Sequence, residues 1–158
     1  MDVTAETLFI KSYIRKNRQE RILFELTTPA RRYDGLSRFC HQAGELINPA
    51  RISMEGEDLN HRAEFTAFVR KHNEICRILS PDPFLDQKQL PLEEAVSMAG
   101  IGTDAALIIG NGFAVVFTEA EKGGRNKYLL YDAEFQKKHS LGVTKCRERR
   151  KFGQNVCI

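Results

Sequence analysis

Apolar residues near the start of the chain recur at the spacing of one helical face. A helix is predicted over about residues 5–17, with Thr4 as its N-cap. The positions that define its apolar face are Phe9, Ile10, Tyr13 and Ile14. The next apolar run, residues 22–26, suits either a helix or a buried strand. The opposite charges of Arg21 and Glu25, four residues apart, favour the helix.

The longest amphipathic pattern predicts a helix that begins at Pro29 or Asp34 and ends at Ile47. Its apolar face consists of Leu36, Phe39, Cys40, Ala43, Leu46 and Ile47. Asn48-Pro49 ends it, because the residue before a proline is pushed out of the helical conformation. Shorter patterns predict a strand at 51–54, a helix at 57–72, a strand at 75–79, a loop at 80–90 and a helix at 91–99 that opens with Pro91.

Two runs rich in apolar and β-branched residues flank Asn111-Gly112 and predict a β-hairpin over residues 105–118. Asn-Gly is a preferred pair for a two-residue turn in which both residues have positive φ, so we expect that backbone conformation here. A looser turn at 122–126 leads to a third strand at 128–131. The second half of the chain therefore contributes an antiparallel meander.

Together these elements predict an α+β fold, in which N-terminal helices pack on an antiparallel sheet that contains the 105–118 hairpin. Periodicity fades after that sheet. We expect a single α+β domain over residues 1–135 and a basic C-terminal extension over residues 136–158. At 158 residues the chain is long enough to bury a core without disulfide bonds or a structural metal.

The composition indicates a soluble protein of the cytoplasm. No apolar run approaches the roughly 20 residues needed to span a bilayer, and the first residues lack the basic start and apolar run of a secretory signal. The four cysteines stand at irregular spacings, so we expect free thiols rather than a disulfide framework. No membrane partner is expected.

Charge is distributed unevenly along the chain, although the net charge is only +3. Residues 1–54 hold nine Lys and Arg against six Asp and Glu, residues 55–121 hold five against twelve, and residues 136–158 hold seven against one. The acidic middle and the basic end attract each other, within one molecule or between molecules, or each faces a different partner.

The basic C-terminal extension is the first candidate binding site. Its positive side chains are Lys145, Arg147, Arg149, Arg150 and Lys151. They are numerous enough to contact several phosphates of a nucleic acid. They also suit an acidic surface on this chain, on a second copy or on a protein partner. We favour an acidic protein surface, because a net charge of +3 is low for a dedicated nucleic-acid-binding domain.

The second candidate is an anion-binding face on the helix expected to end at Ile47. It would consist of Arg31, Arg32, Arg38 and His41. Cys40 and His41 also bring to mind a thiol nucleophile with its base. Adjacent helix residues point about 100° apart, so we interpret Cys40 as a core residue instead.

Metal and nucleotide sites have little support. Zinc accepts the ligand types offered by Cys40, His61, His72 and Cys76, but their spacing lacks the close pairs of a structural zinc site, so no metal is expected. The glycines at 100–102 and 110–112 lack the remaining residues of a phosphate-binding loop and are interpreted as turn or cap positions. We expect no cofactor.

A catalytic centre of carboxylates is the main alternative to a binding function. Asp82, Asp86 or Asp104 with Glu119 would supply the ligands of a metal-dependent nuclease, although no motif joins them. We therefore expect an interaction or regulatory domain that binds a macromolecule, with a protein partner or self-association favoured. The alternatives are a small hydrolase or nuclease with carboxylates from separate elements, and a protein that binds nucleic acid through its basic termini.

Overall fold

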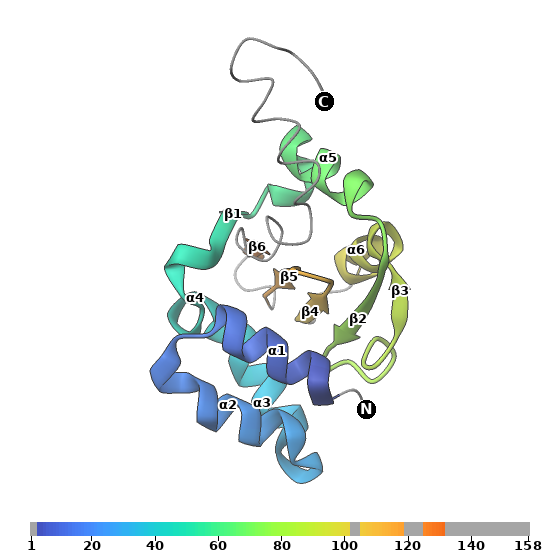
Figure 1. Ribbon diagram of the computed structural model, residues 1–158. Coiled ribbons are helices and arrows are strands. Elements are labelled where there is room, and N and C mark those ends of the chain that lie inside the picture. The colour runs from blue at the N-terminus through green and yellow to red at the C-terminus, as the bar shows by residue number, and fades with distance from the viewer. Residues whose placement is uncertain (1–2, 102–104, 119–124, 132–158) are drawn as a thin grey trace.

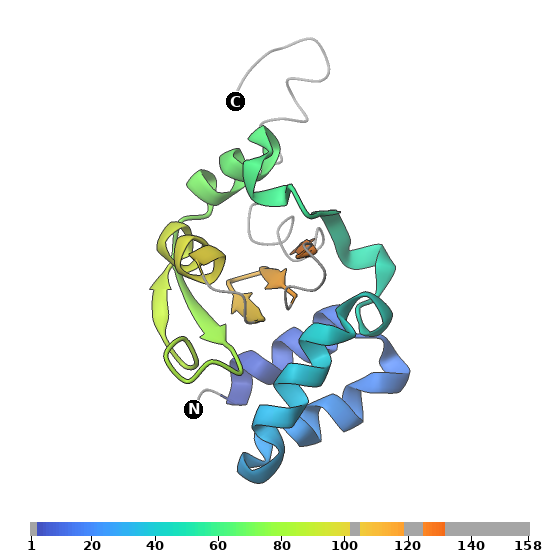
Figure 2. The same cartoon turned by 180° about the vertical axis from the view of Figure 1, so that it is seen from behind.

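A six-stranded antiparallel sheet separates two layers of helices in the computed structural model (Figure 1 and Figure 2). The structure describes residues 3–101, 105–118 and 125–131. The α-helices are α1 (Val3–Tyr13), α2 (Gln19–Thr27), α3 (Pro29–His41), α4 (Ala43–Leu46), α5 (Ala63–Lys71) and α6 (Leu92–Ile101). The 3₁₀-helices are η1 (Lys16–Arg18), η2 (Pro49–Arg51) and η3 (Leu59–His61). The strands are β1 (Ile52–Gly56), β2 (Ile75–Leu79), β3 (Gln89–Pro91), β4 (Ala106–Ile109), β5 (Phe113–Phe117) and β6 (Lys127–Tyr131).

The sheet has the strand order β1-β6-β5-β4-β2-β3, and neighbouring strands are antiparallel throughout. The predicted hairpin forms β4 and β5 at its centre, where Ile109 is paired with Ala114. On the other side of β5, Phe113 is paired with Tyr131 of β6. The α+β fold and its central hairpin are therefore confirmed.

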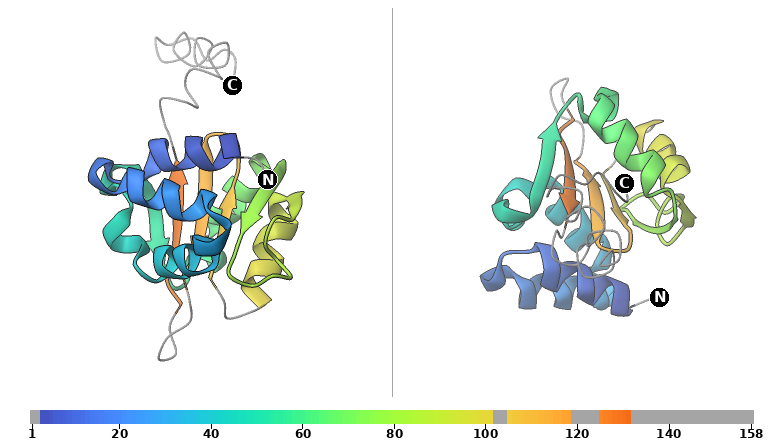
Figure 3. Two further views of the ribbon diagram at one scale, coloured as in Figure 1. Left: turned by 90° about the horizontal axis from the view of Figure 1, so that it is seen from below. Right: turned by 45° about the horizontal axis from the view of Figure 1, so that its top comes forward.

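The central strands are covered by helices on both faces, which explains why they are apolar at nearly every position. Leu107 and Ile109 of β4 pack with the helices α1–α4 on one face. Ala106 and Ile108 of the same strand pack with α5 and α6 on the other face. Figure 3 shows the layer of α1, α2 and α3 lying across the strands. Two hydrophobic cores, one on each face, thus share one sheet.

The N-terminal layer differs from its prediction in where helices begin and end. Residues 22–26 do form a helix, within α2. The first helix ends at Tyr13 because the chain then pairs with a distant segment: Arg15 N–H donates to Leu46 O at 2.9 Å, and Asn48 N–H donates to Tyr13 O at 2.8 Å. Thr4 lies within α1, so its prediction as N-cap is wrong.

The helix expected to run to Ile47 is interrupted at Gln42, which has φ −106° and ψ 20°. The break separates α3 from the short helix α4. It allows Ile47 to leave the helical conformation and form an isolated β-bridge with Ile14. The interruption therefore serves a long-range backbone contact that local periodicity does not encode.

Two local predictions in the second half of the chain are also wrong. Pro91 ends the edge strand β3 rather than opening α6, and an edge strand tolerates a residue without an N–H. In the β4–β5 turn only Gly112 has positive φ, at 84°. Asn111 keeps negative φ, and its N–H donates to Glu74 Oε1 at 2.9 Å. The turn is closed by Gly110 N–H, which donates to Phe113 O at 3.0 Å.

Among the residues that the structure describes, no helix combines the length and the hydropathy of a membrane-spanning segment.

Candidate functional site

A groove of about 370 Å³ lies between α1, the first residues of β2 and the β4–β5 turn. We call it the α1–β2 groove. Side chains from α1 form one wall, β2 forms the other, and the glycine-rich turn closes one end. Leu8, Tyr13, Ile75, Arg77 and Asn111 are among the residues that line it. This volume falls within the range of pockets that take a ligand or a partner's side chains.

Two large apolar side chains stand exposed at the groove. Leu8 of α1 is 61 % exposed, and Ile75 at the start of β2 is 62 % exposed. Leu8 lies off the helical face that Phe9, Ile10 and Tyr13 bury, so no core contact covers it. The apolar surface of the groove therefore continues onto the outside of the domain.

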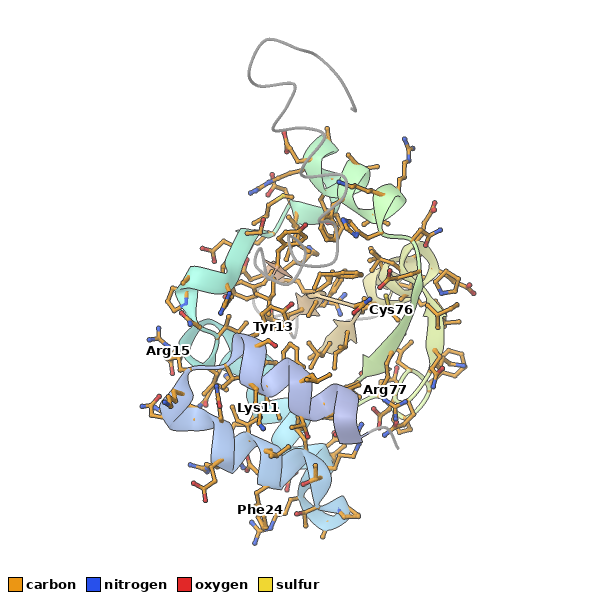
Figure 4. All side chains as sticks on the ribbon, in the orientation of Figure 1. Lys11, Tyr13, Arg15, Phe24, Cys76 and Arg77 are labelled. Atoms are coloured by element: carbon orange, nitrogen blue, oxygen red, sulfur yellow. The ribbon has the colours of Figure 1, made fainter. Side chains whose placement is uncertain are left out.

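Arg77 gives the groove a positive charge. It follows Ile75 by two residues along β2, so both side chains lie on the sheet face that α1 covers. Its Nη2 donates to Gln87 Oε1, while its buried Nε has no acceptor among the described residues. Figure 4 shows Arg77 and Cys76 on β2, and Tyr13 directed from α1 toward the sheet. The groove thus combines apolar walls with one guanidinium.

A buried ionic network lies next to this site, between α1, α3 and the segment before β3. Arg32 Nη1 donates to Glu6 Oε1 at 3.2 Å, and Arg32 Nη2 donates to Asp86 Oδ1 at 3.0 Å. Arg32 Nη1 also donates to Leu26 O at 3.1 Å, and Asp86 Oδ1 accepts the Ser80 N–H at 3.1 Å. These bonds tie together two helices and a loop that are distant in sequence.

Glu6 is the most buried member of the network, with no exposed surface. Its Oε2 has no donor among the described residues. Burial raises the pKa of the Glu6 carboxyl above its ordinary value, and this outweighs the attraction of Arg32, which lowers the pKa. Neither Glu6 nor Asp86 lines the α1–β2 groove. The network therefore has the geometry of a structural clamp rather than of an open catalytic centre.

Asp82, the other described carboxylate named from the sequence, does not join this network. Asp82 Oδ1 accepts the Phe84 N–H at 2.9 Å and so caps a local turn. Asp104 and Glu119 lie outside the described residues.

The four residues of the expected anion-binding face have different environments. Arg32 is buried in the ionic network, and Arg38 forms an ion pair with Glu25. Arg31 and His41 are exposed on α3. The structure therefore does not gather these side chains on one open surface. The basic extension, with Lys145, Arg147, Arg149, Arg150 and Lys151, lies outside the described residues.

The zinc candidates are also separated. Cys40 has no exposed surface and belongs to the core on the α1–α4 side of the sheet, whereas Cys76 belongs to the core on the other side. Burial raises the pKa of the Cys76 thiol to about 12, which keeps it protonated and unreactive. His72 stacks on Phe68 at a centroid distance of 4.2 Å, and burial lowers its pKa. Within the described residues, no three His, Cys, Asp or Glu side chains are placed to hold a metal ion.

Comparison with known proteins adds no name to this site. The sequence matches no protein-family model, and neither the curated proteins nor the solved structures include one that is significantly similar.

Proposed function

We propose that the domain binds a partner protein through the α1–β2 groove. The observation that supports this proposal is the continuity of the groove with the exposed side chains of Leu8 and Ile75. A pocket for a small molecule usually encloses most of its ligand's surface. Here the apolar surface extends beyond the groove, which favours a larger, protein-sized partner that covers the groove and its rim together.

The chemistry of the groove favours an apolar side chain with a neighbouring carboxylate as the group that enters it. The apolar walls would exclude water around the partner's apolar side chain, and Arg77 would pair with its carboxylate. Arg77 forms no direct ion pair with a carboxylate of the described residues, although its charge acts on the buried carboxyl of Glu6, so a partner's carboxylate would be its first direct salt-bridge partner. Charge-assisted bonds to a guanidinium are directional, so they would fix the orientation of the bound segment.

The test uses the double variant Leu8→Asp/Ile75→Asp, because both side chains are exposed and the fold does not depend on them. The tagged wild-type protein is used to capture partners from an extract of its source, and the captured protein is identified and purified. Its affinity is then measured by calorimetry. We expect the double variant to weaken binding at least about tenfold, because each substitution places a charge against an apolar contact.

Phe24→Asp is the matched control. Phe24 is 57 % exposed on α2 and lies away from the groove (Figure 4). It should leave the affinity within about twofold of the wild-type value. Equal weakening by the groove variant and the control, or binding that survives the groove variant unchanged, would show that the partner does not use this groove.

A further inference from the structure

The surface along α1, η1 and α2 is more basic than the sequence of that segment indicates, because two of its acids pair with arginines of α3. Glu6 and Glu25 are both buried, where they pair with Arg32 and Arg38. The exposed charges from residue 11 to residue 21 are Lys11, Arg15, Lys16, Arg18 and Arg21 against Glu20 alone. Internal pairing therefore removes acidic groups from this surface and leaves an excess of positive charge along α1, η1 and α2.

This basic surface contains a small pocket where α2 packs on α3. Arg18, Arg21 and Arg38 line the pocket together with Gln42, and its volume is about 30 Å³. Glu25 also lines it, but Arg38 already neutralises that carboxylate. Among the described residues, Arg18 and Arg21 have no carboxylate partner. The pocket therefore presents two uncompensated guanidinium groups and one amide donor.

The start of α2 adds to the attraction for an anion. Arg18 is the N-cap residue of α2, and its side chain makes no capping hydrogen bond. The free N–H groups at a helix N-terminus carry partial positive charge. Because Gln19 N–H already donates to Lys16 O, the attraction rests mainly on Arg18 and Arg21, whose planar donor groups match the oxygens of a phosphate.

We propose that this face binds the phosphate backbone of a nucleic acid, with one phosphate held by Arg18, Arg21 and Gln42. A free phosphate ion would contact the pocket alone, whereas a nucleic acid would also contact the surface around it. The exposed bases continue past it to Lys16, Arg15 and Lys11, so successive phosphates of one strand meet further positive charges. Because these contacts are to the backbone, binding is independent of base sequence. The surface is separate from the α1–β2 groove and goes beyond the protein-binding function proposed above.

The test measures binding of a short duplex DNA of random sequence to the full-length protein by fluorescence anisotropy, over a series of salt concentrations. In Arg18→Gln/Arg21→Gln we expect at least a tenfold loss of affinity at low salt. The slope of log affinity against log salt should become shallower by about 1, because Arg18 and Arg21 hold the same phosphate. Both side chains are exposed, and equal melting temperatures will show that the fold is intact.

The control is Arg70→Gln/Lys71→Gln, which also removes two positive charges but from α5, in the opposite layer of helices. It should leave affinity and salt slope unchanged. Equal weakening by the two double variants would show that only net charge matters, and an unweakened Arg18→Gln/Arg21→Gln variant would place the contacts elsewhere. Binding of inorganic phosphate without binding of DNA would also overturn the proposal.

Discussion

Arg32 holds two carboxylates at once, and neither comes from its own helix. Glu6 belongs to α1 and Asp86 to the segment before β3, so the guanidinium is the only bridge among the described residues that ionically joins these three parts of the fold. Removing one member of a buried ion pair leaves the other charge without compensation. The stability of the N-terminal layer should therefore depend strongly on this side chain.

We expect Arg32→Met to lower the free energy of unfolding by about 3–5 kcal/mol. Adding Glu6→Gln should recover part of this loss, because the carboxyl left behind is then neutral. The loss should also be larger at neutral than at acidic pH. Burial raises the pKa of Glu6, so stability falls as pH rises from the ordinary value of 4.5 toward the raised pKa.

Urea denaturation of the variants at two pH values measures these differences. Arg31→Met is the control, since Arg31 is an exposed neighbour on the same helix, and it should change stability by no more than about 0.5 kcal/mol. A loss for Arg32→Met as small as that for Arg31→Met would show that the network contributes little.

The sequence misassigns Arg32 because an arginine on a helix is ordinarily a surface residue. Its partners Glu6 and Asp86 are 26 and 54 residues away along the chain, and no local sequence pattern indicates contacts at such separations. Leu8 is the opposite case. An apolar residue of a helix is ordinarily expected in the core, yet Leu8 is exposed. Its position off the face of Phe9, Ile10 and Tyr13 is a signal of exposure that the sequence does contain. The α1–β2 groove itself depends on the tertiary approach of α1 to β2 and could not be predicted.

At the scale of elements, the close packing of α2 on α3 depends on one glycine. A Cβ atom at Gly35 would lie 2.8 Å from the Cβ of Glu25, which is closer than real side chains approach. The Cβ of Glu25 is fixed by the backbone of α2, so the helices themselves would have to separate.

We therefore expect Gly35→Ala to destabilise the protein by about 1–3 kcal/mol, even though alanine favours a helix. Gly100→Ala is the control, because a Cβ at Gly100 of α6 has no neighbour within 4 Å. That variant should gain up to about 1 kcal/mol. Thermal melting monitored by circular dichroism will compare the two. A stabilised Gly35→Ala would mean that α2 and α3 adjust freely.

Local patterns predict the elements that depend on local interactions. The hairpin of β4 and β5 follows from two apolar runs around Asn111-Gly112, and α2 follows from its charge spacing. The break at Gln42 and the strand β3 do not, because each serves a pairing with a distant segment: Ile47 with Ile14, and β3 with β2. Sequence reasoning thus identifies strands and helices better than it identifies their ends.

At the scale of the whole molecule, the two layers of helices differ in charge. The layer of α1–α3 is basic, as described above. The opposite side, around η3, α5 and α6, carries exposed acids. They are Glu57, Asp58, Glu64, Glu93 and Glu94, against the bases Arg62, Arg70 and Lys71. The described chain ends at Tyr131 on this side, where its ring lies 5.6 Å from that of Phe68 in α5. The sequence of the basic extension, residues 136–158, starts five residues after that point.

We expect deletion of residues 136–158 to lower the free energy of unfolding or to shift the oligomeric state, because its positive charges would be attracted to these acids on its own or a second chain. Exposed ion pairs contribute about 0.2–1 kcal/mol each, so several together should amount to about 1–3 kcal/mol. At 1 M salt the Debye length falls to about 3 Å, and the difference should nearly disappear.

Replacing Lys145, Arg147, Arg149, Arg150 and Lys151 by glutamine in the full chain should have the same effect, which separates charge from length. Urea denaturation at low and high salt measures stability, and light scattering measures the oligomeric state. If truncation leaves both unchanged and instead abolishes DNA binding, the extension binds the external polyanion and the acidic side is not its target.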